Sequence, residues 1–283
     1  MGHPLRRGHG FGLRVPHYPG LLEHGVRGAD FVEAVTENFL GRGGRPRAVL
    51  ERVRRDVPVA LHGVSLSIGG TSPLNDRYLD QLRVLCDEIE PAIVSDHLCF
   101  GTFGRHYGHD LWPLPYTEEA VAHVAARVER VQDRLGRRLL LENVSSYARY
   151  ADSQLTEWEF LDAVTERADC DLLLDINNVY VSARNLGFSA EDYLDAIPRH
   201  RVAQFHLAGH SDLGTHLLDD HGSAVPEAVW ELHRRAALRF GATPTIVEWD
   251  EDVPTLDRLA AEVEDARRSE SRALAGASAK DAA

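Results

Sequence analysis

Cysteine, methionine and long hydrophobic runs are scarce in this sequence of 283 residues, which has three cysteines and a single methionine. Cys86, Cys99 and Cys170 are too few and too widely spaced for a disulfide framework or a CxxC zinc site. Free thiols are typical of a reducing compartment. No apolar run approaches the ~20 residues of a membrane-spanning helix, and no apolar segment follows the basic start, as in a signal peptide. We therefore expect a cytoplasmic protein without a membrane span.

Basic residues are also few, because 31 lysines and arginines stand against 44 aspartates and glutamates, a formal net charge of −13. General nucleic-acid binders present a basic face, and anionic membranes attract basic segments. The charge balance therefore argues against both as partners. Hydrophobic residues make up 43% of the chain, which is enough for a large core.

Short apolar runs alternate along the chain with amphipathic segments. Runs such as Leu139–Leu141 and Leu172–Leu174 are typical of strands that are buried on both faces of a parallel sheet. Between two runs, Thr117 is a favourable helix N-cap and Gly136 a favourable stop. The pattern predicts eight strands, at residues 10–15, 30–36, 58–64, 92–96, 138–144, 171–176, 202–207 and 243–249.

Eight strand–helix alternations predict an α/β protein with a (βα)8 TIM barrel, and a doubly wound open sheet is the main competitor. We expect one barrel domain over residues 1–267. The remaining residues, 268–283, are rich in alanine and serine, and we expect them to form a disordered tail.

Six successive predicted strands turn polar at or near their carboxyl ends, where a barrel gathers its functional groups at one mouth. One histidine or aspartate at such a place is usually a packed or capping residue, but six at corresponding places favour a shared function. Burying these groups uncompensated would cost many kcal/mol, and bound cations remove that cost. The set suits iron, manganese or zinc. Its members are His62, His97, Glu142, Asp175, His206 and Glu248.

Histidines and aspartates also follow the seventh predicted strand. His210, Asp219 and His221 could complete a third metal position or orient other ligands, whereas Asp212 and His216 fit a solvated loop. After the fourth strand, residues 98–112 form an unusually long connection with glycines and aromatics. This connection suits either a mobile lid or peptide groove, or an ordered loop that packs the barrel rim.

The ordered set of short motifs resembles the multinuclear non-heme iron-dependent oxidative enzymes (MNIOs), whose best-known member is the iron oxidase of methanobactin biosynthesis. The resemblance runs from about residue 10 to residue 267. It is carried by Gly12-Leu13-Arg14 with His17, Glu37-Asn38, Leu61-His62-Gly63-Val64-Ser65, Ser95-Asp96-His97, Leu114-Pro115-Tyr116, Glu142-Asn143, Asp175-Ile176-Asn177-Asn178, His206-Leu207-Ala208-Gly209-His210, Asp219-Asp220-His221 and Glu248-Trp249-Asp250.

The resemblance implies a xylose-isomerase-like barrel with two or three iron ions of mixed Fe(II)/Fe(III) valence at its mouth. It implies that His62 and His97 bind one iron and that Glu142 bridges to the next. The second iron would have Asp175, His206 and Glu248 as ligands. Asp219 and His221, with Asn178 and His210, match the region of a third ion. Within this set Glu142, Asp175 and His206 are the expected catalytic centre.

Family members use dioxygen to modify residues of ribosomally made peptides, often cysteines. The resemblance therefore implies a precursor peptide as substrate and a small partner protein that recruits it. The residues alone leave other functions open. A di- or trinuclear zinc or manganese hydrolase, as in the endonuclease IV relatives of this barrel, a sugar isomerase, and a metal-dependent scaffold without catalysis all remain alternatives.

Overall fold

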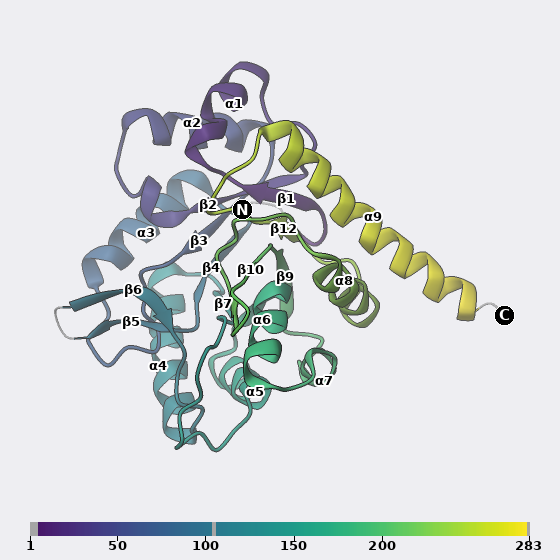
Figure 1. The fold of residues 1–283 in the computed structure, drawn as a ribbon. Coiled ribbons are helices and arrows are strands. Elements are labelled where there is room, and N and C mark those ends of the chain that lie inside the picture. Colours follow the sequence, from purple (N-terminus) through teal and green to yellow (C-terminus); the bar gives the residue numbers. More distant parts are fainter. Residues whose placement is uncertain (1–4, 104–105, 282–283) are drawn as a thin grey trace.

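The computed structural model describes residues 5–103 and 106–281 and confirms the predicted TIM barrel (Figure 1). Eight parallel strands close into a barrel in the order β1-β12-β9-β8-β7-β4-β3-β2. The strands are β1 (His9–Gly12), β2 (Phe31–Val35), β3 (Val59–Gly63), β4 (Ile93–His97), β7 (Leu140–Glu142), β8 (Asp171–Asp175), β9 (Val202–Leu207) and β12 (Thr245–Val247).

Helices surround the barrel and follow the sequence signals closely. Thr117 caps α4 by accepting a hydrogen bond from the backbone of Ala120, and Thr156 and Glu159 form a capping box on α5. None of the described helices is both long and apolar enough to cross a membrane. The α-helices are α1 (Tyr18–His24), α2 (Gly44–Asp56), α3 (Asp76–Ile89), α4 (Glu118–Leu135), α5 (Glu157–Ala168), α6 (Ile176–Leu186), α7 (Ala190–Ala196), α8 (Glu227–Phe240) and α9 (Leu256–Asp281), and two short 3-10 helices are η1 (Val15–His17) and η2 (Thr36–Phe39).

The barrel interior is built in layers, because successive side chains of a strand point to opposite faces. One buried apolar cluster takes a residue from each of six strands: Phe31, Ala60, Ile93, Leu140, Leu173 and Ile246. Further along the same strands, the inward positions carry polar groups instead. The strand period therefore stacks a polar layer directly on an apolar floor.

Two antiparallel hairpins stand outside the barrel sheet. The hairpin of β5 (Phe100–Phe103) and β6 (His106–Trp112) occupies the long connection after β4, and residues 104–105 lie outside the described part. The second hairpin joins β10 (Ser211–Asp212) to β11 (Leu217–Leu218) after β9. The connection after β4 therefore contains regular secondary structure.

Helix α9 extends through the segment in which we expected a disordered tail. It continues to Asp281, with Ser269 and Glu270 buried. The Ser269 hydroxyl lies 3.1 Å from His233 Nδ1 on α8, and Glu270 accepts a hydrogen bond from the backbone of Thr243. These contacts with the barrel side and α8 give the alanine-rich segment a reason to remain helical. The division into one domain and a tail stays a prediction.

Candidate metal centre

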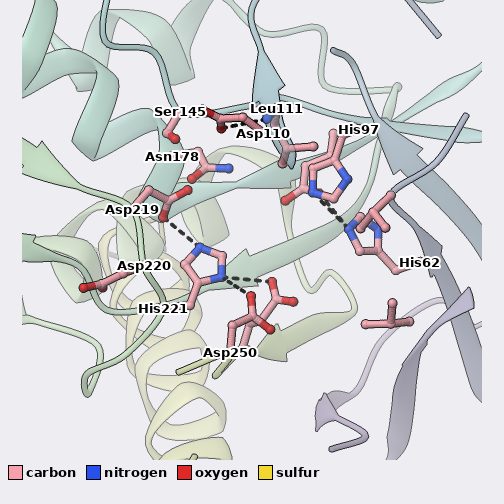
Figure 2. A pocket seen from close by; sticks show the side chains of 14 residues that line it. His62, His97, Asp110, Leu111, Ser145, Asn178, Asp219, Asp220, His221 and Asp250 are labelled. Carbon is pink, nitrogen blue, oxygen red and sulfur yellow. Dashed lines mark hydrogen bonds and ion pairs between the residues drawn. The ribbon is translucent and has the colours of Figure 1, made fainter. Parts of the chain in front are cut away.

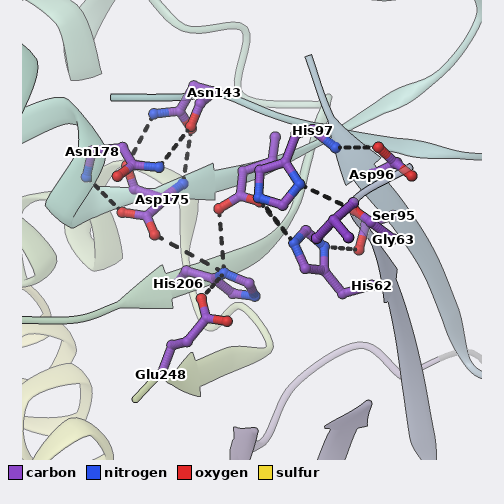
Figure 3. A network of polar contacts seen from close by, with 12 residues as sticks. His62, Gly63, Ser95, Asp96, His97, Asn143, Asp175, Asn178, His206 and Glu248 are labelled. Carbon is purple, nitrogen blue, oxygen red and sulfur yellow. Dashed lines mark hydrogen bonds and ion pairs between the residues drawn. The ribbon is translucent and has the colours of Figure 1, made fainter. Parts of the chain in front are cut away.

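The polar layer at the barrel mouth brings together the six strand-end residues that the sequence singled out. Five of them, all but Glu142, are labelled in Figure 3. His206 on β9 pairs with Ile246 of the apolar floor and with Asp175. All six are buried. Each of the other five comes after a residue of the apolar cluster in the sequence. The separation is two positions for His62, Glu142, Asp175 and Glu248, and four positions for His97.

The first cluster consists of His62, His97 and Glu142. Glu142 Oε2 lies 3.0 Å from His62 Nε2 and 3.1 Å from His97 Nε2, and the two Nε2 atoms are 3.3 Å apart. The other ring nitrogens have separate partners, because His62 Nδ1 lies 2.8 Å from the Ser95 hydroxyl and His97 Nδ1 lies 3.0 Å from the Gly63 carbonyl. These partners aim both Nε2 atoms at Glu142.

The second cluster surrounds His206. Its Nδ1 atom lies 3.0 Å from Glu248 Oε2, 3.3 Å from Glu142 Oε1 and 4.0 Å from Asp175 Oδ2. Glu142 therefore contributes one oxygen to each cluster, as a bridging carboxylate would. Asp175 is held by Asn143, whose side chain bonds the backbone N–H and carbonyl of Asp175.

A third group of donors lies on the loop after β11. His221 Nε2 is 2.8 Å from Asp219 Oδ1, and His221 Nδ1 is 3.2 Å from Asp250 Oδ2 and 3.5 Å from Glu248 Oε2 (Figure 2). Arg14 pairs with both Glu248 and Asp250. His221 also shares with Asp175 and Glu248 a set of donor atoms within 4.8 Å of one another.

Asn178 and His210 are the remaining candidates from the sequence. Asn178 lines a cavity together with His62, His97 and Glu142, and its amide donates to the Asn143 carbonyl. His210 Nδ1 lies 2.7 Å from Asn177 Oδ1, and Asn177 donates to Asp219. The structure thus places His210 behind Asp219, outside the clusters of donor atoms found among the described residues.

Glu33 is a buried carboxylate that the sequence reasoning did not single out. Its Oε1 lies 2.9 Å from His206 Nε2, on the side of the ring opposite the second cluster. In the sheet, β1 and β12 lie between the strands of Glu33 and His206, and the inward positions of β1 are Gly10 and Gly12 in the register with β2 and β12. Two features of the sequence could have indicated Glu33. One is the pair of alternating glycines in β1, and the other is a charged residue inside the apolar run of β2.

Several polar atoms of this layer lack the hydrogen bonds that buried groups normally make. Glu142 Oε2, Asp175 Oδ2, His206 Nδ1 and His221 Nε2 are buried without a hydrogen bond of acceptable geometry, and so is Asn178 Oδ1. Carboxylate and imidazole atoms that converge without bonding one another suit cations. Four overlapping sets of three donors meet this description: His62–His97–Glu142, Glu142–Asp175–His206, Asp175–His221–Glu248 and Glu33–His206–Glu248.

The pKa values of the layer indicate which of its donor atoms carry protons when no metal ion is bound. Burial lowers the pKa of His62, but Glu142 and Glu33 outweigh burial and raise it to about 9. Burial raises the pKa of Glu142, yet His97, His62 and His206 hold it well below its usual range. Burial, helped by Glu142, raises the pKa of Asp175 to about 8. Without metal, the site therefore retains protons on some of its donors.

An open cavity of about 390 Å³ leads from solvent to these donors (Figure 2). The cavity is lined by His62, His97 and Glu142, and by Asp110 and Leu111 from β6. Cys99 lies two residues beyond His97, but it is buried outside this lining, and burial raises the pKa of its thiol well above 9. The free cysteine near the site is therefore a packing residue.

Known proteins match this chain over nearly its whole length. A UPF0276 protein of Anaeromyxobacter sp. (strain Fw109-5) is 59% identical over 270 residues, covering 95% of this chain and 94% of that protein. A UPF0276 protein of Acaryochloris marina (strain MBIC 11017) is 50% identical over 260 residues, covering 92% and 94%.

Solved structures with the same fold are distant in sequence. Endonuclease IV from Thermus thermophilus superposes with a TM-score of 0.60 at 18% identity, covering 93% of this chain and 98% of that one. A xylose isomerase domain protein from Alicyclobacillus acidocaldarius gives 0.56 at 20% identity, covering 92% and 94%. These likenesses confirm the xylose-isomerase-like barrel and carry no statement about activity.

The family model described as "RiPP precursor modification enzyme MbnB/TglH/ChrH" matches residues 8–271, nearly the whole chain. RiPPs are ribosomally synthesised and post-translationally modified peptides, so the family acts on precursor peptides. This match confirms the resemblance seen in the sequence motifs. The chain belongs to the MbnB/TglH/ChrH family of RiPP precursor modification enzymes.

Proposed function

We propose that this enzyme holds two or three iron ions at the barrel mouth and uses dioxygen to oxidise a residue, often cysteine, of a precursor peptide. The observation that carries the proposal is the convergence of buried, unbonded donor atoms from several strands on one open cavity. The donors are imidazoles and carboxylates without thiolates, a set that suits iron. The family match supplies the peptide as substrate.

In this proposal His62, His97 and Glu142 hold one ion, and Asp175, His206 and Glu248 hold the next. Glu142 lies between them with one oxygen directed at each set. Asp219, His221 and Asn178 are the proposed residues of a third ion, and His210 orients Asp219 through Asn177. Glu142, Asp175 and His206 form the catalytic centre.

Iron at these positions would supply dioxygen binding and redox chemistry that no side chain of the chain provides. The protein's own groups fix the donors and control protons. Ser95 and Gly63 orient the rings of His62 and His97, and Glu33 faces the Nε2 atom of His206, so that its Nδ1 atom faces the cluster. Metal binding would release the proton that His62 retains because of its raised pKa.

A small partner protein that delivers the precursor peptide completes the proposal. It is supported by the resemblance to enzymes that act with such a partner. The cytoplasm is the proposed location, in keeping with three cysteines that are free and buried.

The test is co-expression of the chain with the short precursor peptides encoded beside its gene, followed by mass spectrometry of each peptide. We expect a mass change that requires both iron and dioxygen and is lost with Glu142→Gln. Anaerobically purified protein should contain about two to three irons per chain, the number that the donor sets suggest.

The same preparation separates the alternatives. Stoichiometric zinc with phosphate-ester hydrolysis and no oxygen uptake would replace the oxidative proposal by a hydrolase. Sugar isomerisation with manganese would indicate an isomerase. If the Glu142→Gln variant modified the peptide as the parent does, the catalytic role of the metal centre would be wrong.

A further inference from the structure

We infer that the precursor peptide binds in an extended conformation along a groove of three consecutive cavities, with an apolar side chain seated in the outermost one. The inference rests on the proposed function in one respect, because it takes the metal cavity as the place of reaction. The peptide nature of the substrate comes from the family.

Three cavities of similar size lie beside one another on the mouth side of the barrel. The first, of about 390 Å³, is the metal cavity. The second, of about 340 Å³, lies against the start of α5 and the end of α6. The third, of about 420 Å³, lies between the β5–β6 hairpin and the start of α4.

Two chain segments, residues 110–117 and 145–150, contribute to all three cavities. Along the first segment, Asp110 and Leu111 face the first cavity, Pro113 and Tyr116 face the second, and Pro115 and Thr117 face the third. Leu114 is shared by the second and third. The cavities are therefore successive parts of one groove whose wall is this segment.

The opposite wall follows residues 145–150 in the same direction. Ser145 lines the first cavity, Ser146 and Arg149 line the second, and Tyr150 is shared by the second and third. Both walls thus begin at the metal cavity and extend to the third cavity. An extended chain is the peptide conformation that lets successive side chains reach successive cavities.

The two outer cavities differ in chemistry. The second contains Glu157, which accepts a hydrogen bond from Tyr193, and Arg149, whose guanidinium lies 5.8 Å from the Phe188 ring centre. The third has mainly apolar walls. Its lining includes Phe100, Leu114, Pro115, Ala120, Val124 and Tyr150.

This contrast assigns an apolar peptide side chain to the third cavity. Burying a large apolar side chain is the main source of affinity that such a wall can offer. Tyr150, with 39% of its surface exposed, stands between the outer cavities, and Trp112 is 43% exposed at the nearby end of β6. Exposed aromatic rings beside a cavity are typical of peptide-binding surfaces.

Helix α4 offers a matched pair of substitutions. Ala120 lines the third cavity, and Ala126 is exposed on the same helix and lines none of the three. Ala120→Trp fills the third cavity, whereas Ala126→Trp adds the same side chain elsewhere. Circular dichroism of both variants establishes that each is folded as the parent is.

The experiment selects displayed random decapeptides on the metal-loaded parent and on both variants. We expect the parent and Ala126→Trp to enrich peptides that share an apolar residue at one position, and Ala120→Trp to lose that preference. A synthetic peptide from the selection should bind Ala120→Trp about tenfold or more weakly, the effect of losing one buried apolar side chain.

Identical enrichment by all three proteins would overturn the groove and leave the oxidative function standing. Failure of every protein to enrich peptides would also overturn it, while the oxygen-dependent mass change of the co-expressed peptide still reports on the proposed function. A mass change without peptide selectivity at the third cavity is therefore distinguishable from the loss of both.

Discussion

His62, His206 and His221 at the barrel mouth and His9 and His233 beside helix α9 are all buried, but their neighbours differ. Each mouth histidine has a carboxylate oxygen at 3.0, 2.9 or 2.8 Å, respectively. His9 Nε2 lies 3.8 Å from a carboxylate oxygen of Glu270, and His233 Nδ1 lies 3.1 Å from the Ser269 hydroxyl.

The pKa values diverge accordingly. Carboxylates outweigh burial at His62, His206 and His221 and raise the pKa of these three imidazoles. At His97, also at the mouth, burial outweighs Glu142 and lowers the pKa. Beside α9, burial lowers the pKa of His9 to about 4, with Arg267 adding to the effect, and lowers that of His233 to about 3. Beside α9, a buried imidazole is thus a neutral packing group. At the barrel mouth it lies among carboxylates, in a layer that suits bound cations.

The largest effect is expected from Glu142→Gln. This carboxylate contacts His62, His97 and His206, so removing its charge should cost the chain at least one bound ion and abolish peptide modification. Metal analysis after anaerobic reconstitution measures the loss. Glu270→Gln, the same change beside α9, should leave the metal content unchanged. A comparable loss there would show that the metal content does not depend on the carboxylates of the mouth.

Alanine at one histidine of each region should give opposite results. His206→Ala should reduce metal content sharply with a modest loss of secondary structure, because the barrel core lies below the mouth. His233→Ala should leave metal content intact and lower the free energy of unfolding by about 2–4 kcal/mol, as core truncations do. Metal analysis and urea unfolding check the pair, and unchanged metal loading of His206→Ala would refute it as a ligand.

Glu33→Gln should weaken metal binding by about 10–100-fold, a typical result of changing the partner of a metal-bound histidine. The reason is that Glu33 Oε1 lies 2.9 Å from His206 Nε2 and keeps the other ring nitrogen free for metal. Competition with a metal-binding dye measures the affinity. An unaltered affinity would leave Glu33 as a packing residue only.

The smallest effect concerns pH. Because His9 and His233 have folded-state pKa values of about 4 and 3, below the ordinary 6.5, the unfolded chain binds more protons between these values. Acidification from pH 6.5 toward 4 should therefore lower stability, by up to about 1.4 kcal/mol per pH unit for each imidazole.

His9→Gln isolates this contribution. Urea unfolding at pH 7 and pH 5 should show a smaller loss of stability for the variant than for the parent. The barrel-mouth residues are the same in both proteins, so their titration does not contribute to the difference. An equal or larger loss in the variant would show that His9 is protonated in the folded chain.

Much of this could be predicted from the sequence because strand periodicity is local. His62, Glu142 and Asp175 could be assigned to one mouth since each ends a buried run, and parallel strands in a barrel end together. The total of fifteen histidines was less informative, because His9 and His233 count equally but serve packing.

Other features depend on contacts between distant segments. Glu33 reaches His206 across the glycines of β1, which follows from barrel stagger and not from either strand alone. Helix α9 is anchored at Ser269 and Glu270 by α8 and by Thr243, contacts that an alanine-rich composition does not reveal. The shared walls of the three cavities likewise appear only once the β5–β6 hairpin is folded.

The most direct measurement is anomalous diffraction at the iron edge from crystals of the anaerobically loaded protein. We expect one peak among His62, His97 and Glu142, and a second among Asp175, His206 and Glu248. Iron bound elsewhere, or a mouth whose donors pair with one another and show no peak at full loading, would show that the proposed metal centre is wrong.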